Sequence, residues 1–270
     1  APVAQKWIAD HQFQSGKFAE AEQGYRRLFE NTNLLANARG MEWEARLNAG
    51  RSAFFRQEHA AAELLLASVI NATNAPVAEQ ARAEFFLGDV AADQTQRTPT
   101  NLLDALPHYQ RVANEMIGSP LHPLAWGRVG DCYLQLGNLG PAADAYRAVT
   151  ELPGTDVTTR SQAGLGLARV LEEQAALAGE TEEREKLLQL SFDQCMGIVF
   201  GSNLRSANEK MDPFWVKEAG LMAGHLAGRL GRADQERSVY SRLAKELPDM
   251  PLWQAKLDAL KVGPEAPKAP

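Results

Sequence analysis

Residues 123–156, PLAWGRVGDCYLQLGNLGPAADAYRAVTELPGTD, contain the pattern that decides the fold. Large and small residues stand at helical spacing within it, at Trp126, Val129, Gly130 and Tyr133 and then at Ala142 and Tyr146. Gly130 has no side chain, so a second helix can approach it closely, and Tyr146 would fill the remaining gap. Gly137 lies in the turn between the two helices, and Pro153 ends the second because its nitrogen cannot donate a hydrogen bond. The stretch therefore predicts two antiparallel helices in close contact.

One such pair of helices cannot bury its own apolar face, so similar pairs should flank it. Counting from Gly130 in units of about 34 residues finds small residues at matching positions, namely Ala9, Gly50, Gly88, Gly164 and Gly224. We therefore predict an all-α solenoid of about six helix–turn–helix repeats. The amphipathic segment that starts at Pro251 is predicted to be a C-terminal capping helix, because an uncovered last repeat would expose apolar surface.

Two segments interrupt the regular pattern. Extra residues in the third unit, roughly 94–102, are rich in Thr, Pro and Gln and predict a loop. We then expect Asp104 to cap the next helix and Pro107 to lie in its first turn, where a missing N–H does no harm. The Pro- and Ala-rich residues 263–270 predict a tail or linker, so the predicted solenoid domain spans residues 1–262.

The pattern in residues 123–156 resembles the tetratricopeptide repeat (TPR), with its closing proline one place early. The resemblance covers nearly the whole chain and implies a right-handed superhelix whose first helices line a concave face. That face would bind a peptide or partner protein. Within the superfamily the chain looks most like exported bacterial TPR scaffold proteins, on the basis of its Ala1-Pro2 start, irregular repeat lengths and Pro-rich tail. We therefore expect a periplasmic or cell-envelope location.

The ligand-contacting positions of TPR proteins can be transferred to the first helices of four units. They fall on Lys6, Asp10, Asn48, Arg51, Phe55, Arg82, Phe85, Asp89, Arg128, Asp131 and Gln135. Cations, amides and aromatic rings in this mixture suit an extended peptide or a partner helix. Ordinary solvated surface is the alternative for any single one of them, because composition separates interfaces from other surface only weakly.

The carboxylate-clamp subfamily of TPR proteins, which grips the acidic C-termini of chaperones, offers a sharper comparison. This chain is similar to it at Lys6, Asn48 and Arg82. It departs at Asp10, where the subfamily has asparagine, and at Phe86, where it has a basic residue. Asp10 would set a negative charge beside the expected carboxylate and repel it, so we predict that no such clamp is present.

Signatures of catalysis are missing from the sequence. It has no phosphate-binding loop, no H-E-x-x-H pair and no G-x-S-x-G turn, and Gly164-Leu165-Gly166 reads as helix packing. Cys132 and Cys195 fall on apolar stretches, where buried free thiols are the preferred interpretation and a disulfide is left open. We predict a protein without enzymatic activity, cofactor or metal.

Charge and hydropathy narrow the choice of partner. A net charge of −6 argues against nucleic acid, and no apolar run is long enough for membrane insertion. The hypothesis is therefore a non-catalytic protein–protein interaction scaffold. Two alternatives stay open. One is a sensor or interaction module of a larger regulatory protein. The other is a helical-toroid enzyme acting on carbohydrate, which would use the tryptophans as a sugar platform, although these more simply pack between repeats.

Overall fold

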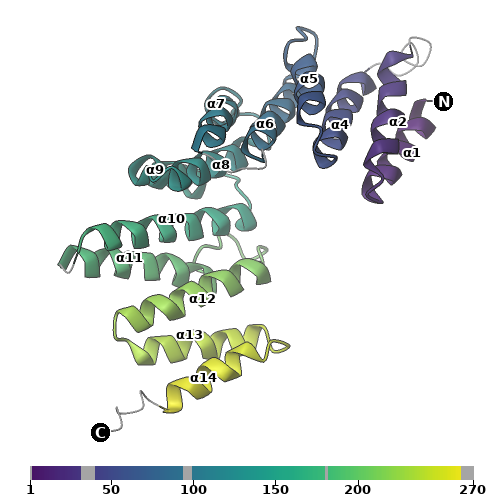
Figure 1. The fold of residues 1–270 in the computed structure, drawn as a ribbon. Coiled ribbons are helices and arrows are strands. Elements are labelled where there is room, and N and C mark those ends of the chain that lie inside the picture. The colour runs from purple at the N-terminus through teal and green to yellow at the C-terminus, as the bar shows by residue number, and fades with distance from the viewer. Residues whose placement is uncertain (1, 32–39, 94–98, 180–181, 263–270) are drawn as a thin grey trace, which may run out of the picture. The chain divides into compact units, whose positions relative to one another are not determined.

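The computed structural model describes residues 2–31, 40–93, 99–179 and 182–262. Within these ranges the chain forms thirteen α-helices and no β-strand. Figure 1 labels the helices along the chain. The predicted all-α class is therefore confirmed. The predicted tail, residues 263–270, lies outside the described residues.

The helices follow one another in the predicted pairs, with one further helix at the end. The bounds are α1 (Pro2–Gln14) and α2 (Phe18–Glu30), α4 (Met41–Phe55) and α5 (His59–Ile70), α6 (Val77–Asp93) and α7 (Pro99–Glu115), α8 (His122–Gln135) and α9 (Leu139–Glu151), α10 (Val157–Leu177) and α11 (Glu182–Val199), α12 (Pro213–Arg229) and α13 (Ala233–Glu246), and α14 (Leu252–Val262). The last helix packs against α13, as the predicted cap should. Gly137, with φ +74°, turns the chain between α8 and α9.

The contacts divide the chain into two compact units, Ala1–Cys132 and Tyr133–Pro270. Each helix of the first unit from α1 to α7 packs against the next, and α4 also touches α6. In the second unit the same holds from α9 to α14, and α10 touches α12. First helices of successive repeats are therefore neighbours within a unit, which is the solenoid arrangement. A single array over residues 1–262 stays a prediction.

Glycine lets consecutive helices approach closely, as predicted within the pair α6 and α7 and also between α9 and α10, which belong to different pairs. A Cβ atom built on Gly88 of α6 would lie 2.5 Å from the Tyr109 ring of α7, and one on Gly166 would lie 2.5 Å from the Tyr146 ring. Both tyrosines are buried, so neither ring could move aside without opening a void. The Gly-Leu-Gly sequence in α10 is thus confirmed as packing.

Two details of the packing were predicted wrongly. Helix α7 begins at Pro99, so Asp104 is not its cap and Pro107 lies inside the helix. The residues predicted to form the end of the loop instead add a turn to α7. Among the tryptophans, Trp253 is fully buried, whereas Trp7 is 67% exposed and stacks on His11. Packing between repeats therefore does not explain Trp7.

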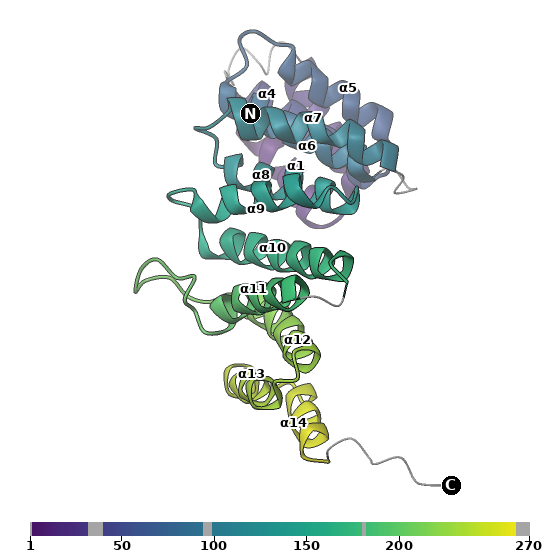
Figure 2. The ribbon, with the colours of Figure 1, turned by 90° about the vertical axis from the view of Figure 1, so that its left-hand side faces the viewer.

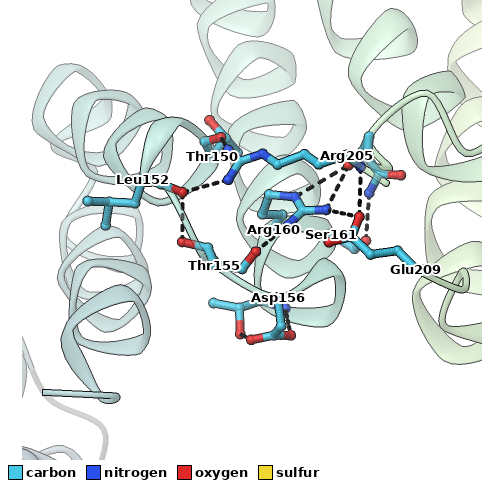
Figure 3. A network of polar contacts seen from close by, with 10 residues as sticks. Thr150, Leu152, Thr155, Asp156, Arg160, Ser161, Arg205 and Glu209 are labelled. Atoms are coloured by element: carbon cyan, nitrogen blue, oxygen red, sulfur yellow. Dashed lines mark hydrogen bonds and ion pairs between the residues drawn. The ribbon is translucent and has the colours of Figure 1, made fainter. Parts of the chain in front are cut away.

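A loop between α11 and α12, residues 200–212, is bound to the start of α10 (Figures 2 and 3). The Arg160 side chain is only 3% exposed and donates hydrogen bonds to the backbone carbonyls of Thr155 and Asn203 and, at 2.6 Å, to the Glu209 carboxylate. Burying a guanidinium is tolerable here because its donors have acceptors.

A second arginine, which lies in the loop, holds the loop against the end of α9. Arg205 lies in the loop and donates to the backbone carbonyls of Thr150 and Leu152, the latter at 2.6 Å, while its own N–H donates to Glu209 at 2.7 Å. Asp212 closes the loop by capping α12 through the Phe214 N–H. Arg160, Arg205 and Glu209 together are called the loop latch below.

The close approach at Gly88 gives a first prediction. Gly88→Ala should lower the free energy of unfolding by about 1–3 kcal/mol, because the new methyl group overlaps the buried Tyr109 ring. Gly127→Ala is the matched control, since Gly127 lies inside α8 with nothing within 4 Å of the added Cβ. It should stabilise the protein by up to about 1 kcal/mol through helix propensity. Thermal unfolding followed by circular dichroism measures both. Equal effects would contradict the close-packing account.

The loop latch gives a second prediction. Arg160→Met should destabilise the protein by about 1–3 kcal/mol, because two carbonyl oxygens lose a buried donor. Arg147→Met, which removes an exposed arginine from α9, should cost less than about 0.5 kcal/mol. Urea unfolding measures the difference. Proteolysis should also cut within residues 200–212 faster in Arg160→Met only.

The stability that the loop latch contributes should also depend on pH. Hydrogen bonds from Arg160 and Arg205 hold the pKa of Glu209 below its usual 4.5. A carboxyl group with a lowered pKa in the folded state adds stability above its unfolded pKa and loses that stability as the pH falls through the folded one. The gap in stability between the wild type and Glu209→Gln should therefore be present at pH 6 and shrink below about pH 4.5. A gap that does not change with pH would show that the Glu209 charge is irrelevant.

Candidate binding face on the first helices

Polar and aromatic side chains of α1, α4, α6 and α8 interact with one another along the first helices of the N-terminal unit. We call this set the first-helix face, and it consists of Lys6, Asp10, Phe13, Glu44, Asn48, Arg51, Phe55, Arg82, Phe86, Asp89, Arg128 and Asp131. Its members contact each other across helices, so each side chain has a fixed neighbour. Nine of the predicted ligand positions belong to this face.

At one end of the face, two carboxylates compensate the positive charge of Lys6. Lys6 Nζ lies 2.8 Å from Asp10 Oδ2 and 3.1 Å from Glu44 Oε1 on α4. Burial alone would lower the pKa of Lys6, but the bonds to these carboxylates raise it above its usual 10.5. Tyr25 donates to the other oxygen of Asp10 at 2.8 Å. Two carboxylates therefore neutralise one cation, and this end carries a net negative charge.

At the centre of the face, Arg51 lies against two aromatic rings. The Arg51 guanidinium carbon lies 5.0 Å from the centroid of Phe13 and 4.7 Å from that of Phe86. Nη1 donates to the Asn48 side chain at 3.4 Å, and Nε is buried with no hydrogen-bond partner. Burial, and then repulsion from Arg82, lower the pKa of Arg51. No carboxylate among the described residues forms an ion pair with it.

An exposed aromatic side chain lies beside this arginine. Phe55 follows Arg51 by one helical turn on α4 and is 49% exposed. Its ring stacks on Phe18 at 5.0 Å between centroids and meets the edge of Phe13 at 5.6 Å. The rigid neighbours hold Phe55 in place. A partly buried cation and an exposed apolar ring thus stand next to each other.

The other end of the face again has two carboxylates around one cation. Arg128 of α8 lies 3.7 Å from Asp89 and 3.6 Å from Asp131. Burial raises the pKa of Asp89 above its usual 3.8, although a 2.7 Å hydrogen bond from Tyr109 and the charge of Arg128 oppose this. Arg82, nearer the centre, pairs with Glu79 of its own helix at 3.1 Å.

Two predicted residues lie apart from this arrangement. Phe85 is 7% exposed and packs edge-on against the buried Tyr109, so it belongs to the core. Its neighbour Phe86, absent from the predicted set, lies over Arg51 instead. Gln135 is exposed at the end of α8 and belongs to the second unit. A helical turn separates Phe86 from Arg82, and that spacing is the signal that could have indicated it.

Other kinds of site find little support in the described part of the chain. None of its His, Cys, Asp and Glu side chains gather in a group of three or more able to hold a metal ion. No described helix is both long and apolar enough to cross a bilayer. Cys132 and Cys195 are free and buried, and burial raises the pKa of each thiol to about 12, so neither is a reactive thiolate at neutral pH.

Solved structures share this architecture. PilF from Pseudomonas aeruginosa, a TPR protein, aligns over 97% of this chain and 96% of its own, with a TM-score of 0.57 and 12% identity. The chain has the TPR fold. BtubC from P. vanneervenii aligns over 100% of this chain and 96% of its own, with a TM-score of 0.50 and 12% identity. No protein-family model matches the sequence, and no curated protein matches it significantly.

The charge of Arg51, which no carboxylate of the described residues pairs with, gives a prediction for the first-helix face. Arg51→Met should raise the free energy of unfolding by about 1 kcal/mol, because methionine can pack between Phe13 and Phe86 without the loss of hydration that a buried cation suffers. Arg128→Met should instead lower it by about 1 kcal/mol, because Asp89 loses its counter-charge. Urea unfolding measures both. A large loss of stability in Arg51→Met would mean that Arg51 has a structural role.

Proposed function

We propose that the protein is a non-catalytic interaction scaffold whose first-helix face binds a peptide or a segment of a partner protein. Arg51 is the observation that supports this most. A guanidinium that is partly buried, fixed by two rings and not paired with a carboxylate lowers the stability of the free protein. Such a group is well suited to an anionic partner, which would supply the missing counter-charge.

The neighbourhood of Arg51 supports binding to a protein segment over binding to a small ion. Phe55 offers an exposed ring beside the cation, and aromatic residues together with arginine are the side chains that most often dominate protein interfaces. The face also extends across four first helices, which suits an extended chain or a helix. The likeness to exported bacterial TPR scaffolds in its irregular repeats leads us to propose a periplasmic or cell-envelope location as well.

Capture of partners tests this proposal. The wild-type chain, Arg51→Glu and Arg27→Glu would each be used as bait in an extract of the organism that makes the protein, with mass spectrometry as readout. Arg27 is an exposed arginine on α2, a second helix of the same unit, so it is matched in charge change. We expect a protein that both the wild type and Arg27→Glu retain and that Arg51→Glu loses.

Circular dichroism and thermal unfolding of the three baits show whether each is folded. A partner that all three baits retain equally would contradict binding at the first-helix face. Proteins lost from both variants would indicate a response to charge alone.

A further inference from the structure

Arg51 differs from the other cations of the first-helix face. Lys6 and Arg128 each have two carboxylates nearby, and Arg82 has Glu79. Arg51 has an amide oxygen, from Asn48, and within the described residues no carboxylate pairs with it. The face therefore has a positive centre between two ends that each carry an excess of negative charge.

The position of the Arg51 charge is fixed. The rings of Phe13 and Phe86 both lie close to its guanidinium, and Asn48, which is 8% exposed, accepts a hydrogen bond from Nη1. Asp89 attracts it from beyond ion-pair distance. The Nη2 donors form no hydrogen bond within the described part of the chain. A planar pair of donors in a fixed orientation matches the two oxygens of a carboxylate.

We infer that the face recognises one acidic side chain of a partner segment that carries a large apolar side chain on the same side. The carboxylate pairs with Arg51, and the apolar side chain packs on Phe55. This inference rests on the proposed function and adds the chemistry of the partner to it.

The two ends of the face restrict the partner further. Asp10 with Glu44 at one end and Asp89 with Asp131 at the other would repel additional acidic residues. Basic or neutral residues should therefore flank the single acid. A cluster of acids at a chain end is not the expected ligand, because Lys6, which would have to bind it, is already neutralised by two carboxylates.

Synthetic peptides test this inference. Fluorescein-labelled nine-residue peptides would carry a central Glu and a Phe two residues later, so that both side chains point to one side of an extended peptide. This pair is written Glu-Phe below, and its flanks contain lysine and glycine. Matched peptides would carry Gln-Phe, Glu-Gly or a Glu-Glu-Glu-Phe run. Fluorescence anisotropy measures the affinity of each for the full chain. We expect Glu-Phe to bind about tenfold more tightly than Gln-Phe, the usual effect of one charge-assisted hydrogen-bonded pair.

Variants of the protein show which side chain of the face contacts the Glu of the peptide and which contacts the Phe. Arg51→Met should reduce the ratio of Glu-Phe to Gln-Phe affinity to about one, whereas Arg27→Met should leave it unchanged. Phe55→Ala should remove the preference for Glu-Phe over Glu-Gly, and Phe214→Ala, which removes an exposed ring of the second unit, should not.

Three outcomes would overturn the inference. They are equal binding of Glu-Phe and Gln-Phe by the wild type, tighter binding of the triple-acid peptide than of Glu-Phe, and no binding of Glu-Phe peptides at all. If any of these occurs while Arg51→Glu still loses a captured partner, the proposed function stands and only the partner chemistry is wrong. If no partner is lost either, the first-helix face is not a binding site.

Discussion

The close approach of paired helices at a residue without a side chain is the constraint on which the rest of the structure depends. At Gly88 the ring of Tyr109 occupies the space where a Cβ would stand, and Tyr240 does the same at Gly224. Helices packed this closely cannot slide or rotate without displacing a buried ring, so their outer side chains keep a fixed register. That register places Arg51 of α4 against Phe86 of α6. The arrangement of the first-helix face is thus a consequence of the packing behind it.

Two kinds of interaction on the first-helix face have different consequences for stability. The ion pairs Lys6–Glu44 and Asp89–Arg128 link different first helices and offset their own desolvation. Arg51 also connects first helices, but through ring contacts. A cation–π contact recovers part of the cost of burying a charge, yet an uncharged side chain could fill the same space without that cost. Ligand binding explains a charge in this setting more simply than stability does.

Most of the fold could be predicted because glycine, alanine and tyrosine at helical spacing describe a contact within one helical pair. The site could be predicted only in part. The helical spacing of residues along a first helix predicts which positions face outward. It does not predict which neighbour each side chain contacts. Phe85 and Phe86 are adjacent, and only the packing of Tyr109 places the first of them in the core. The pair of Arg160 and Glu209 joins residues 49 positions apart, so no local pattern reveals it.

On the first-helix face, affinity and specificity for a partner would depend on different charged groups. A partner that approaches the face meets one uncompensated cation, Arg51, rather than a broad basic surface, so long-range attraction contributes little and salt should weaken binding only slightly. In the proposed complex the free energy of binding would then come from the short-range pairing with Arg51 and from apolar contact at Phe55. The carboxylates at both ends act against the wrong partners, since each would repel a second acid. Carboxylates that stabilise the fold by pairing with Lys6 and Arg128 would therefore also select the ligand, and losing one of them would relax specificity before it reduced affinity.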